Sequence, residues 1–497
     1  MKSWLRLTVI LASLAVMLTV CQVTKSSPSA SGTGGNGSTG DTSTTTVSDG
    51  GSPIACSDLF DQSIVPSYSI DISADDWAKL TADFHDLKDV EAGMPPQTYY
   101  PVTFHYGSET VSNAAIRLRG KSSWVNTVLY DANPKMQFDI SFDQVDSSQK
   151  FHGLASIHLA MPRDDWTFIN TRIGYTWFRK IGIAAPCANS ATVTINGTYY
   201  GLYVAEGAEN KKLLQEFFPG NSSGDLFQYG TEAKTNTSSP NWAKLQALQS
   251  ATTVSALRGL VDLPNTILEW AAEAVVNDAD GYYGGSHNYY LYDEGADGYV
   301  WLPDQTDSAL EWPELFTGVS YREHPLYWWE GRVAPDRPGA DWLIVLINDP
   351  NWVALYTDAI ATQLGKWDIN EILGWIDTWS AQVSSAMTAD PHRWATPDQF
   401  ASAVTALRDV VQNRPTYLQS FVNCEHGIAT DTTDGDHDGY PWCNDCDDTA
   451  PNVHPAAPEI CGNHIDDNCN GVVDENCPGE QAGYPGQVDG GAPPIAH

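Results

Sequence analysis

Runs of alternating apolar and polar residues fill much of the first half of the chain and predict strands with one polar face. The runs with this pattern are 100–106, 114–119 and 136–142, and residues 288–292 and 298–302 are two further expected strands beyond the first half. Residues 191–204 predict a hairpin, because Asn196-Gly197 is the strongest short turn signal between two such runs. We therefore expect the first half of the chain to be rich in strands.

Helical spacing of apolar residues predicts helices in three regions. A strand that begins at Ser67 leads into 74–80, whose first turn is acidic, as helix N-termini prefer. Residues 167–181 and most of 341–424 also have helical spacing. The expected fold class is α+β, with a strand-rich N-terminal half and a helical C-terminal half.

Composition and charge limit the classes of binding partner that we expect for this chain. The chain has 497 residues, of which 42% are hydrophobic, so it can build a sizeable core. Its formal net charge is −36. Such a chain has no basic stripe to neutralise phosphates, so nucleic acid is excluded as an expected partner.

The N-terminus has the pattern of a targeting segment. Lys2 and Arg6 precede the apolar stretch 7–20, which is short for a membrane-spanning helix. Cys21 follows, and this resembles the acylated cysteine of a bacterial lipoprotein. We expect 1–21 to direct export, with either a lipid on Cys21 as the sole membrane attachment or plain secretion.

Composition also predicts the domain boundaries. Residues 22–55 are rich in Ser, Gly and Thr and are expected to form a disordered linker. A large domain is expected at 56–425, a Cys- and Asp-rich module at 426–477, and a disordered tail at 478–497.

Two acidic runs near the C-terminus have the spacing of cation-binding loops. Oxygen ligands at alternate positions, followed by a glycine that permits a sharp turn, suit a hard cation such as calcium. The candidate ligands are Asp434, Asp436, Asp438 and Asp445 in the first run, and Asp466, Asn468, Asn470, Asp474 and Glu475 in the second.

Cysteines are threaded through the same module. With Cys21 set aside, the even number that remains favours disulfides in an exported chain. These residues are Cys56, Cys187, Cys424, Cys443, Cys446, Cys461, Cys469 and Cys477. Cys56 and Cys187 are a plausible bridge, and the connectivity of the other six stays open. The spacing of Cys443 and Cys446 would also suit zinc, although the dense carboxylates favour disulfides.

One near-motif in the large domain is rejected. Residues 115–122 approach the spacing of a P-loop, but Ala115 replaces the first glycine and no clear helix is expected after Ser122. A phosphate cradle of that type needs both features.

A different series resembles the spore-coat protein H (CotH) kinase family over about 65–420. It includes Arg117-x-Arg119-Gly, Pro134-Lys135, and Ile195-Asn-Gly followed by Glu206. It continues with Asp278-x-Asp280-Gly, His287-Asn288, and Pro303-Asp304-x-x-Asp307. The resemblance implies an atypical protein-kinase-like fold in an exported protein. Where the family usually has Pro-Trp-Asp-x-Asp, this chain has Pro303-Asp-Gln-Thr-Asp307.

The resemblance agrees with what phosphoryl transfer needs: a cation on the phosphates, metal-holding groups, and an Asp that orients the acceptor hydroxyl. Lys135 is expected to supply the cation and to pair with Glu206, while Asp280 serves as the base. Arg117 and Arg119 are either phosphate contacts or structural ion pairs. Asn288, Asp304 and Asp307 are the expected ligands of Mg²⁺ or Mn²⁺, with ATP as the nucleotide.

The tail resembles the MopE-type myxobacterial metal-binding motif over about 431–477. The matching elements are 445–448, 455–461 and 466–475. The family is associated with calcium and with copper, and the hard oxygen ligands of this chain favour calcium.

Two functions remain open at this point. The first is an exported, surface-associated kinase-like enzyme that uses ATP to phosphorylate Ser or Thr of a surface or secreted protein. The second is a catalytically degenerate relative that serves as a surface scaffold with a calcium-binding tail, which the altered 303–307 motif would favour. Paired carboxylates of a glycoside hydrolase are not evident.

Overall fold

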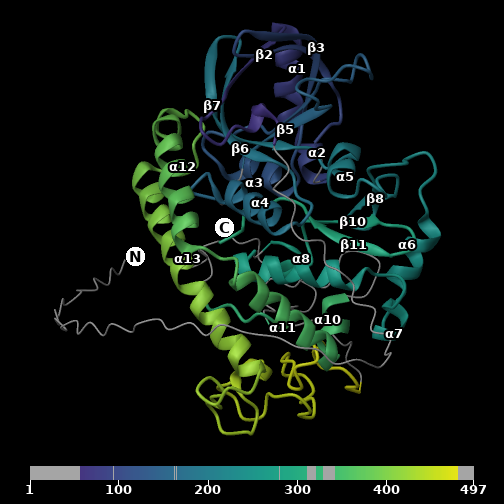
Figure 1. The fold of residues 1–497 in the computed structure, drawn as a ribbon. Coiled ribbons are helices and arrows are strands. Elements are labelled where there is room, and N and C mark those ends of the chain that lie inside the picture. The colour runs from purple at the N-terminus through teal and green to yellow at the C-terminus, as the bar shows by residue number, and fades with distance from the viewer. Residues whose placement is uncertain are drawn as a thin grey trace, which may run out of the picture. The chain divides into compact units, whose positions relative to one another are not determined.

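Seven strands close into a barrel in the N-terminal part of the described chain (Figure 1). Their order is β1-β2-β3-β4-β5-β7-β6, and the parallel pairing of β1 with β6 closes the barrel. The strands are β1 (Ser67–Ile72), β2 (Tyr100–Tyr106), β3 (Glu109–Leu118), β4 (Phe138–Ser141), β5 (Ser156–Ala160), β6 (Ala188–Ile195) and β7 (Thr198–Gly207). Alternate residues such as Tyr68, Ile70 and Phe104 are buried in one apolar core, as the period-2 pattern requires.

The computed structural model describes residues 56–92, 95–161, 163, 165–278, 280–310, 321–327 and 342–478, all within the unit 50–497. The predicted signal segment with Cys21, and the linker, lie outside the described residues, as does nearly all of the predicted C-terminal tail. A search of the described residues for a helix with the length and apolarity of a membrane span finds none.

Six helical segments accompany the barrel. They are η1 (Asp58–Phe60), α1 (Ala74–Phe84), α2 (Leu87–Ala92), α3 (Ser122–Tyr130), α4 (Asn170–Ile181) and α5 (Lys211–Phe217). Ser73 caps α1 by accepting a hydrogen bond from the amide of Asp76. The expectation that no helix follows Ser122 is wrong, because α3 begins there. Ala115, however, is part of β3, so the glycine-rich turn of a P-loop is still missing.

A second, smaller sheet follows the barrel and has the strand order β11-β10-β8-β9. Its strands are β8 (Leu226–Gln228), β9 (Glu232–Ala233), β10 (Tyr289–Asp293) and β11 (Tyr299–Pro303). Every residue of β10 and β11 is buried, which explains their nearly continuous apolar and aromatic sequence.

The C-terminal part is mainly helical (Figure 1). Its helices are α6 (Trp242–Gln249), α7 (Val254–Leu257), α8 (Leu263–Val276), α9 (Tyr282–Gly285), α10 (Trp342–Ile347), α11 (Pro350–Leu364), α12 (Ile369–Ala389) and α13 (Pro397–Glu425). Helix α8 packs against α11, α13 and β11, and α12 contacts β7 of the barrel. The α+β fold class, with its strand-rich first half, is confirmed.

Candidate functional site

A buried cation–carboxylate pair lies where β3 and β7 end. Arg119, directly after β3, donates from Nη1 to Oε2 of Glu206 over 3.1 Å. Burial raises the pKa of Glu206, and the guanidinium opposes that rise. For Arg119, burial lowers the pKa, but the carboxylates of Glu206, Glu209 and Asp304 outweigh it, so the pKa is raised overall. Arg119 is therefore the cation that faces the acidic group formed by Glu206, Glu209 and Asp304.

Two further carboxylates belong to the same group. The side chain of Asp304 is buried and accepts a 2.6 Å hydrogen bond from Gln228. Glu209 accepts a 3.2 Å hydrogen bond from the hydroxyl of Tyr290. Burial, with repulsion from Asp304 and Glu206, raises the pKa of Glu209 to about 8. Burial also raises the pKa of Asp304. Three buried carboxylates that repel one another form a group whose charge a divalent cation would neutralise.

Asp280 and Asn288 are brought together beside Asp304. The Nδ2 atom of Asn288 donates to Oδ2 of Asp280 over 2.6 Å, and the amide of Asp304 donates to the carbonyl of Asn288 over 2.7 Å. The side chain of Asp280 is 54% exposed, whereas Asn288 is buried. His287 lies 3.5 Å from the other carboxylate oxygen of Asp280. The exposed carboxylate of Asp280 is thus bonded to the buried side chain of Asn288, whose backbone is bonded to that of Asp304.

The expected pairing of Lys135 with Glu206 is wrong. The Nζ atom of Lys135 lies 2.6 Å from Oδ2 of Asp390 and 2.5 Å from the carbonyl of Leu202. It also lies over the ring of Tyr203 at 4.4 Å. Both charged side chains are buried between the barrel and the segment after α12. Asp390 could not be anticipated, because it is 255 residues further along the chain.

Two other predicted residues lie in different surroundings. Arg117 pairs with Asp139 at 2.6 Å and donates to Gln97, so it makes a structural ion pair on the barrel. The side chain of Asp307 is half-buried, and its carbonyl accepts a 3.3 Å hydrogen bond from Asn170. Asp304 is joined to Asn288 by the hydrogen bond from its backbone amide to the Asn288 carbonyl.

Sequence reasoning missed Glu209, Gln228 and Lys121. Lys121 lies at the N-terminus of α3, with its Nζ atom 4.6 Å from the ring centre of Tyr229, and its charge acts on Asp304. The sequence signal was the basic stretch 117–121, of which only Arg117 and Arg119 were taken as candidates.

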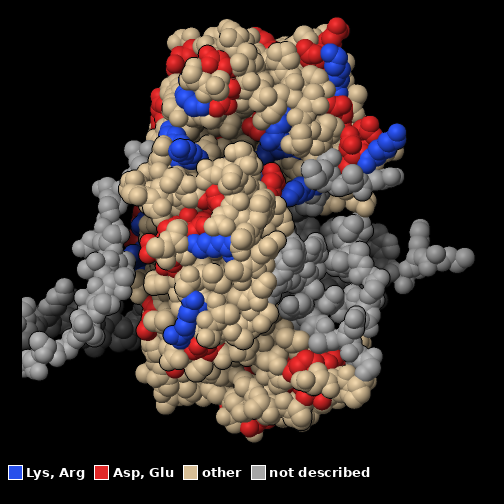
Figure 2. Space-filling model, turned by 90° about the vertical axis from the view of Figure 1, so that its right-hand side faces the viewer, with Lys and Arg blue, Asp and Glu red and all other residues tan. Residues whose placement is uncertain are grey.

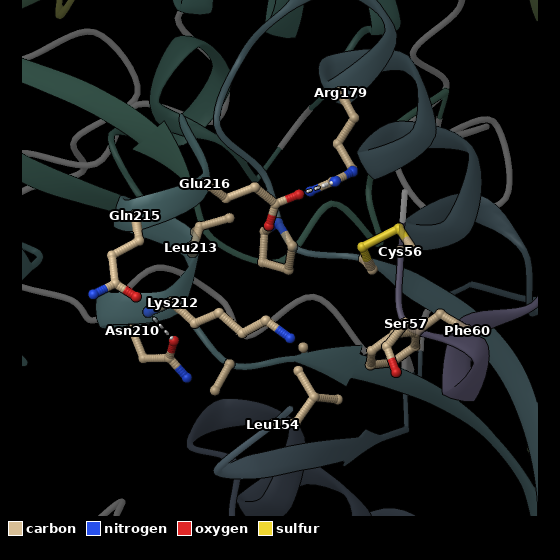
Figure 3. Close-up of a pocket in the computed structure, with 14 residues that line it drawn as sticks. Cys56, Ser57, Phe60, Leu154, Arg179, Asn210, Lys212, Leu213, Gln215 and Glu216 are labelled. Carbon is tan, nitrogen blue, oxygen red and sulfur yellow. Dashed lines mark hydrogen bonds and ion pairs between the residues drawn. A yellow bond between two sulfur atoms is a disulfide. The ribbon is translucent and has the colours of Figure 1, made fainter. Parts of the chain in front are cut away.

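A pocket of about 320 Å³ lies beside Gly207, at the end of β7 (Figure 3). The Cys56–Cys187 disulfide, the Arg179–Glu216 ion pair and Lys212 line it, and the side chain of Lys212 points into it. None of the predicted catalytic residues lines this pocket.

Two buried glutamates lie beneath the Asp280 segment. Glu273, in α8, accepts a 2.5 Å hydrogen bond from the amide of Tyr283, and a Cβ on Gly281 would lie only 2.8 Å from its carboxylate. Burial raises the pKa of Glu269, one turn earlier, to about 8, and raises that of Glu273 further. The backbone after Asp280 is therefore fixed by a carboxyl group of α8.

The predicted disulfides of the large domain and the tail are all formed. Cys56 pairs with Cys187. The other bridges are Cys424–Cys443, Cys446–Cys469 and Cys461–Cys477. Cys443 and Cys446 thus bond to different partners, which leaves no Cys-x-x-Cys pair for zinc.

The first acidic loop of the tail gathers its carboxylates as a cation site would. Oxygen atoms of Asp436, Asp438 and Asp445 lie within 4.8 Å of one another, and so do those of Asp434, Asp436 and Asp448. Each carboxylate of the first trio has a buried oxygen without a hydrogen-bond partner. Burial and neighbouring carboxylates raise the pKa of Asp445 to about 6. These residues fit a divalent cation, and Asp448 adds a ligand that the sequence analysis missed.

The second loop is arranged differently. Asn468 and Asn470 both donate to Oε1 of Glu475, whose other carboxylate oxygen is buried without a partner. Asp466 accepts from the amides of Asn470 and Gly471, and burial raises its pKa to about 7. Asp474 is directed elsewhere, accepting from the amide of Gly462.

Charges on the surface are mixed on the face that Figure 2 shows. Basic side chains there lie among acidic ones, and the largest tan areas carry neither charge.

The α+β fold and the chain's family relationship define a kinase-like protein. The chain belongs to the CotH kinase protein family, whose family model matches residues 116–418, more than half of the sequence. Residues 445–475 match the MopE family, a metal-binding motif named for copper. No curated protein matches the chain.

Eight chains of solved structures match. One is the Helicobacter pylori proinflammatory kinase CtkA, at 10% identity and a TM-score of 0.29. That alignment covers 59% of this chain and 94% of CtkA.

Proposed function

We propose that this protein is an exported, surface-associated kinase that transfers the γ-phosphoryl group of ATP to Ser or Thr of a surface or secreted protein. The observation that carries the proposal is the contact of Asp280, Asn288 and Asp304. The exposed carboxylate of Asp280 accepts a 2.6 Å hydrogen bond from the buried side-chain amide of Asn288, and the backbone carbonyl of Asn288 accepts from the backbone amide of Asp304, whose side chain is also buried. Membership of the CotH kinase protein family supports this assignment.

The residues have separate roles in this proposal. Asp280 accepts the proton of the acceptor hydroxyl, since it is the most exposed carboxylate of the group. Asn288 and Asp304 hold Mg²⁺ or Mn²⁺, which neutralises phosphate charge when bound. Arg119 and Lys121 contact the phosphates. Both residues lie directly before the N-terminus of α3, and a helix N-terminus favours bound anions. Glu206 keeps Arg119 in position.

Labelled ATP tests the catalytic role directly. Residues 55–497 incubated with magnesium and labelled ATP should label an acceptor protein or the chain itself. Asp280→Asn should abolish labelling and leave the melting temperature nearly unchanged, because the side chain is half-exposed and Asn keeps its shape. Asp297→Asn, which removes an exposed carboxylate between β10 and β11, is the matched control. Wild-type labelling by Asp280→Asn would refute the role of Asp280.

The scaffold function remains the second candidate, because one observation favours it. Lys135, the cation that the family resemblance implied for ATP, is only 1% exposed and forms a buried ion pair with Asp390. A scaffold would bind magnesium or nucleotide weakly or not at all, and no variant of Asp280 would change the labelling of any protein. Calorimetry of ATP binding therefore separates the two functions.

In the tail, we propose that the acidic loops bind calcium. The hard oxygen ligands and the unpartnered carboxylate oxygens support this choice. Titration of the full chain with calcium and with copper, followed by tryptophan fluorescence, would distinguish the two ions.

A further inference from the structure

The tail module packs on the helical part through its first cation loop. The ring of Trp442 lies 5.4 Å from that of Tyr417 and 5.8 Å from that of His324. The neighbouring Cys443 is bonded to Cys424 near the end of α13. Trp442 lies in the chain between the candidate ligands Asp438 and Asp445. A conformational change that closes this loop would therefore also shift the residues that contact Trp442.

One chain of contacts leads from Trp442 to the segment after Asp280. His324 accepts hydrogen bonds at Nδ1 from the amides of Leu326 and Tyr327, so its proton is on Nε2, which donates to the carbonyl of Trp442 over 3.2 Å. Burial lowers the pKa of His324 to about 3, consistent with a neutral ring. The carbonyl of His324 accepts a 2.8 Å hydrogen bond from the hydroxyl of Tyr283.

A second chain of contacts starts at the other acidic loop. Asn348 donates to the carbonyl of Asn470 over 3.0 Å. In α10, the side chain of Ile344 lies so close to Gly471 that a Cβ there would be 2.8 Å away. At the other end of α10, the amide of Trp342 donates to the hydroxyl of Tyr282 over 3.0 Å.

We propose that the tail module positions the Asp280 segment, so that calcium bound in the acidic loops fixes the backbone of residues 280–283. Trp442 and Asn470 are the positioning residues, and each lies within one of the two loops. The contacts end on Tyr282 and Tyr283, directly after Asp280. The coupling rests on the proposed binding of calcium in the tail, and the importance of Asp280 rests on the proposed kinase function.

The cause of the coupling is electrostatic. Without a cation, the carboxylates of Asp436, Asp438 and Asp445 repel one another within 4.8 Å. Bound calcium removes that repulsion and favours the closed loop, in which Trp442 meets His324. A ligand that binds only the ordered state lowers the population of the open state by the factor 1 + [L]/Kd, or about tenfold at ten times the Kd.

Hydrogen exchange on the full chain tests the coupling without any need for kinase activity. Calcium, compared with EDTA, should slow exchange in peptides from 434–448 and also in peptides from 280–288, by up to about tenfold if the coupling is complete. The double variant Tyr282→Phe/Tyr283→Phe removes both terminal hydroxyls and keeps the rings. It should lose the effect at 280–288 and retain it at 434–448.

The matched control is Tyr356→Phe. This hydroxyl, from α11, donates to the carbonyl of Pro325 over 3.0 Å, next to His324, but it is not part of the Asp280 segment. It should leave both effects of calcium unchanged. Slowing at 434–448 without slowing at 280–288 would overturn the proposal, and so would no effect in either region. Slowing at 280–288 that survives in the double variant would also overturn it, because calcium would then act beside Asp280 itself. If the wild-type protein labels no acceptor while calcium still slows exchange at 280–288, only the proposed kinase function is contradicted.

Discussion

Replacing Lys135 with Met tests whether this lysine stabilises the fold or binds the nucleotide. The variant removes a cation whose Nζ atom lies 2.6 Å from Asp390 and 2.5 Å from the carbonyl of Leu202. The exposed fractions of Lys135 and Asp390 are 1% and 0%. Asp390 would be left as a buried charge that accepts hydrogen bonds from the amides of Leu202 and His392.

The expected cost follows from that burial. Removing one partner of a buried pair typically destabilises a protein by about 3–5 kcal/mol, because the other charge is left uncompensated. Lys135→Met should therefore lower the free energy of unfolding by about this amount. Adding Asp390→Asn should recover part of the loss, since Asn carries no charge and keeps one oxygen that can accept from one of the two amides. A coupling of about 0.5–3 kcal/mol between the two sites is expected.

Urea unfolding, followed by tryptophan fluorescence at pH 7, measures these changes. Lys79→Met is the control, since Lys79 is an exposed lysine that is also paired with an aspartate, and it should leave stability nearly unchanged. ATP affinity, measured by calorimetry on the folded variants, should not depend on Lys135. A Lys135→Met protein with wild-type stability and no ATP affinity would refute this reasoning and restore Lys135 as the nucleotide cation.

Three further predictions concern buried or clustered carboxyl groups. Burial raises the pKa of Glu269 to about 8, so the folded state retains a proton that the unfolded chain releases above about pH 4.5. Stability from this group is present at low pH and is lost as the pH rises toward 8. Glu269→Gln should reduce this loss, as urea midpoints at pH 5 and pH 8 would show, and equal slopes with pH in both proteins would contradict it. Burial and neighbouring carboxylates also raise the pKa of Glu209 to about 8, so magnesium must displace a proton, and its affinity should increase from pH 6 to pH 8. Calorimetry of Glu209→Gln should give a flatter pH profile. In the tail, protease should nick between Cys424 and Cys477 in EDTA and be excluded in millimolar calcium, whereas equal resistance in both conditions would mean that the disulfides suffice.

The secondary structure was largely predictable because its signals are local. Alternation set the barrel strands, and Asn196-Gly197 forms the hairpin turn with positive φ at both residues, as that turn requires. Helix α3 was missed because Ser122 to Tyr130 has no side-chain cap and is defined by its packing: Trp124 is buried and donates to the carbonyl of Phe84 in α1.

The candidate site was predictable where its members are close in sequence. Asp280 and Asn288 are eight residues apart, and the structure places them in contact. Lys135 and Glu206 were paired by analogy, and the pairing was wrong because Asp390 comes from the segment after α12. Connectivity of the six tail cysteines was also out of reach, since six cysteines allow fifteen pairings and local sequence ranks none of them.

The closure of the barrel by β1 and β6 has a consequence for how the chain is made. The first strand finds its parallel neighbour only after about 120 more residues have been synthesised, and Cys56 meets Cys187 across a separation of 131 residues. At about 5–20 residues per second, the first strand and its cysteine wait on the order of 7–26 seconds for their partners. Throughout that interval β1 presents an open edge and Cys56 a free thiol. Once the chain is in an oxidising compartment, the formation of the Cys56–Cys187 bond would report barrel closure.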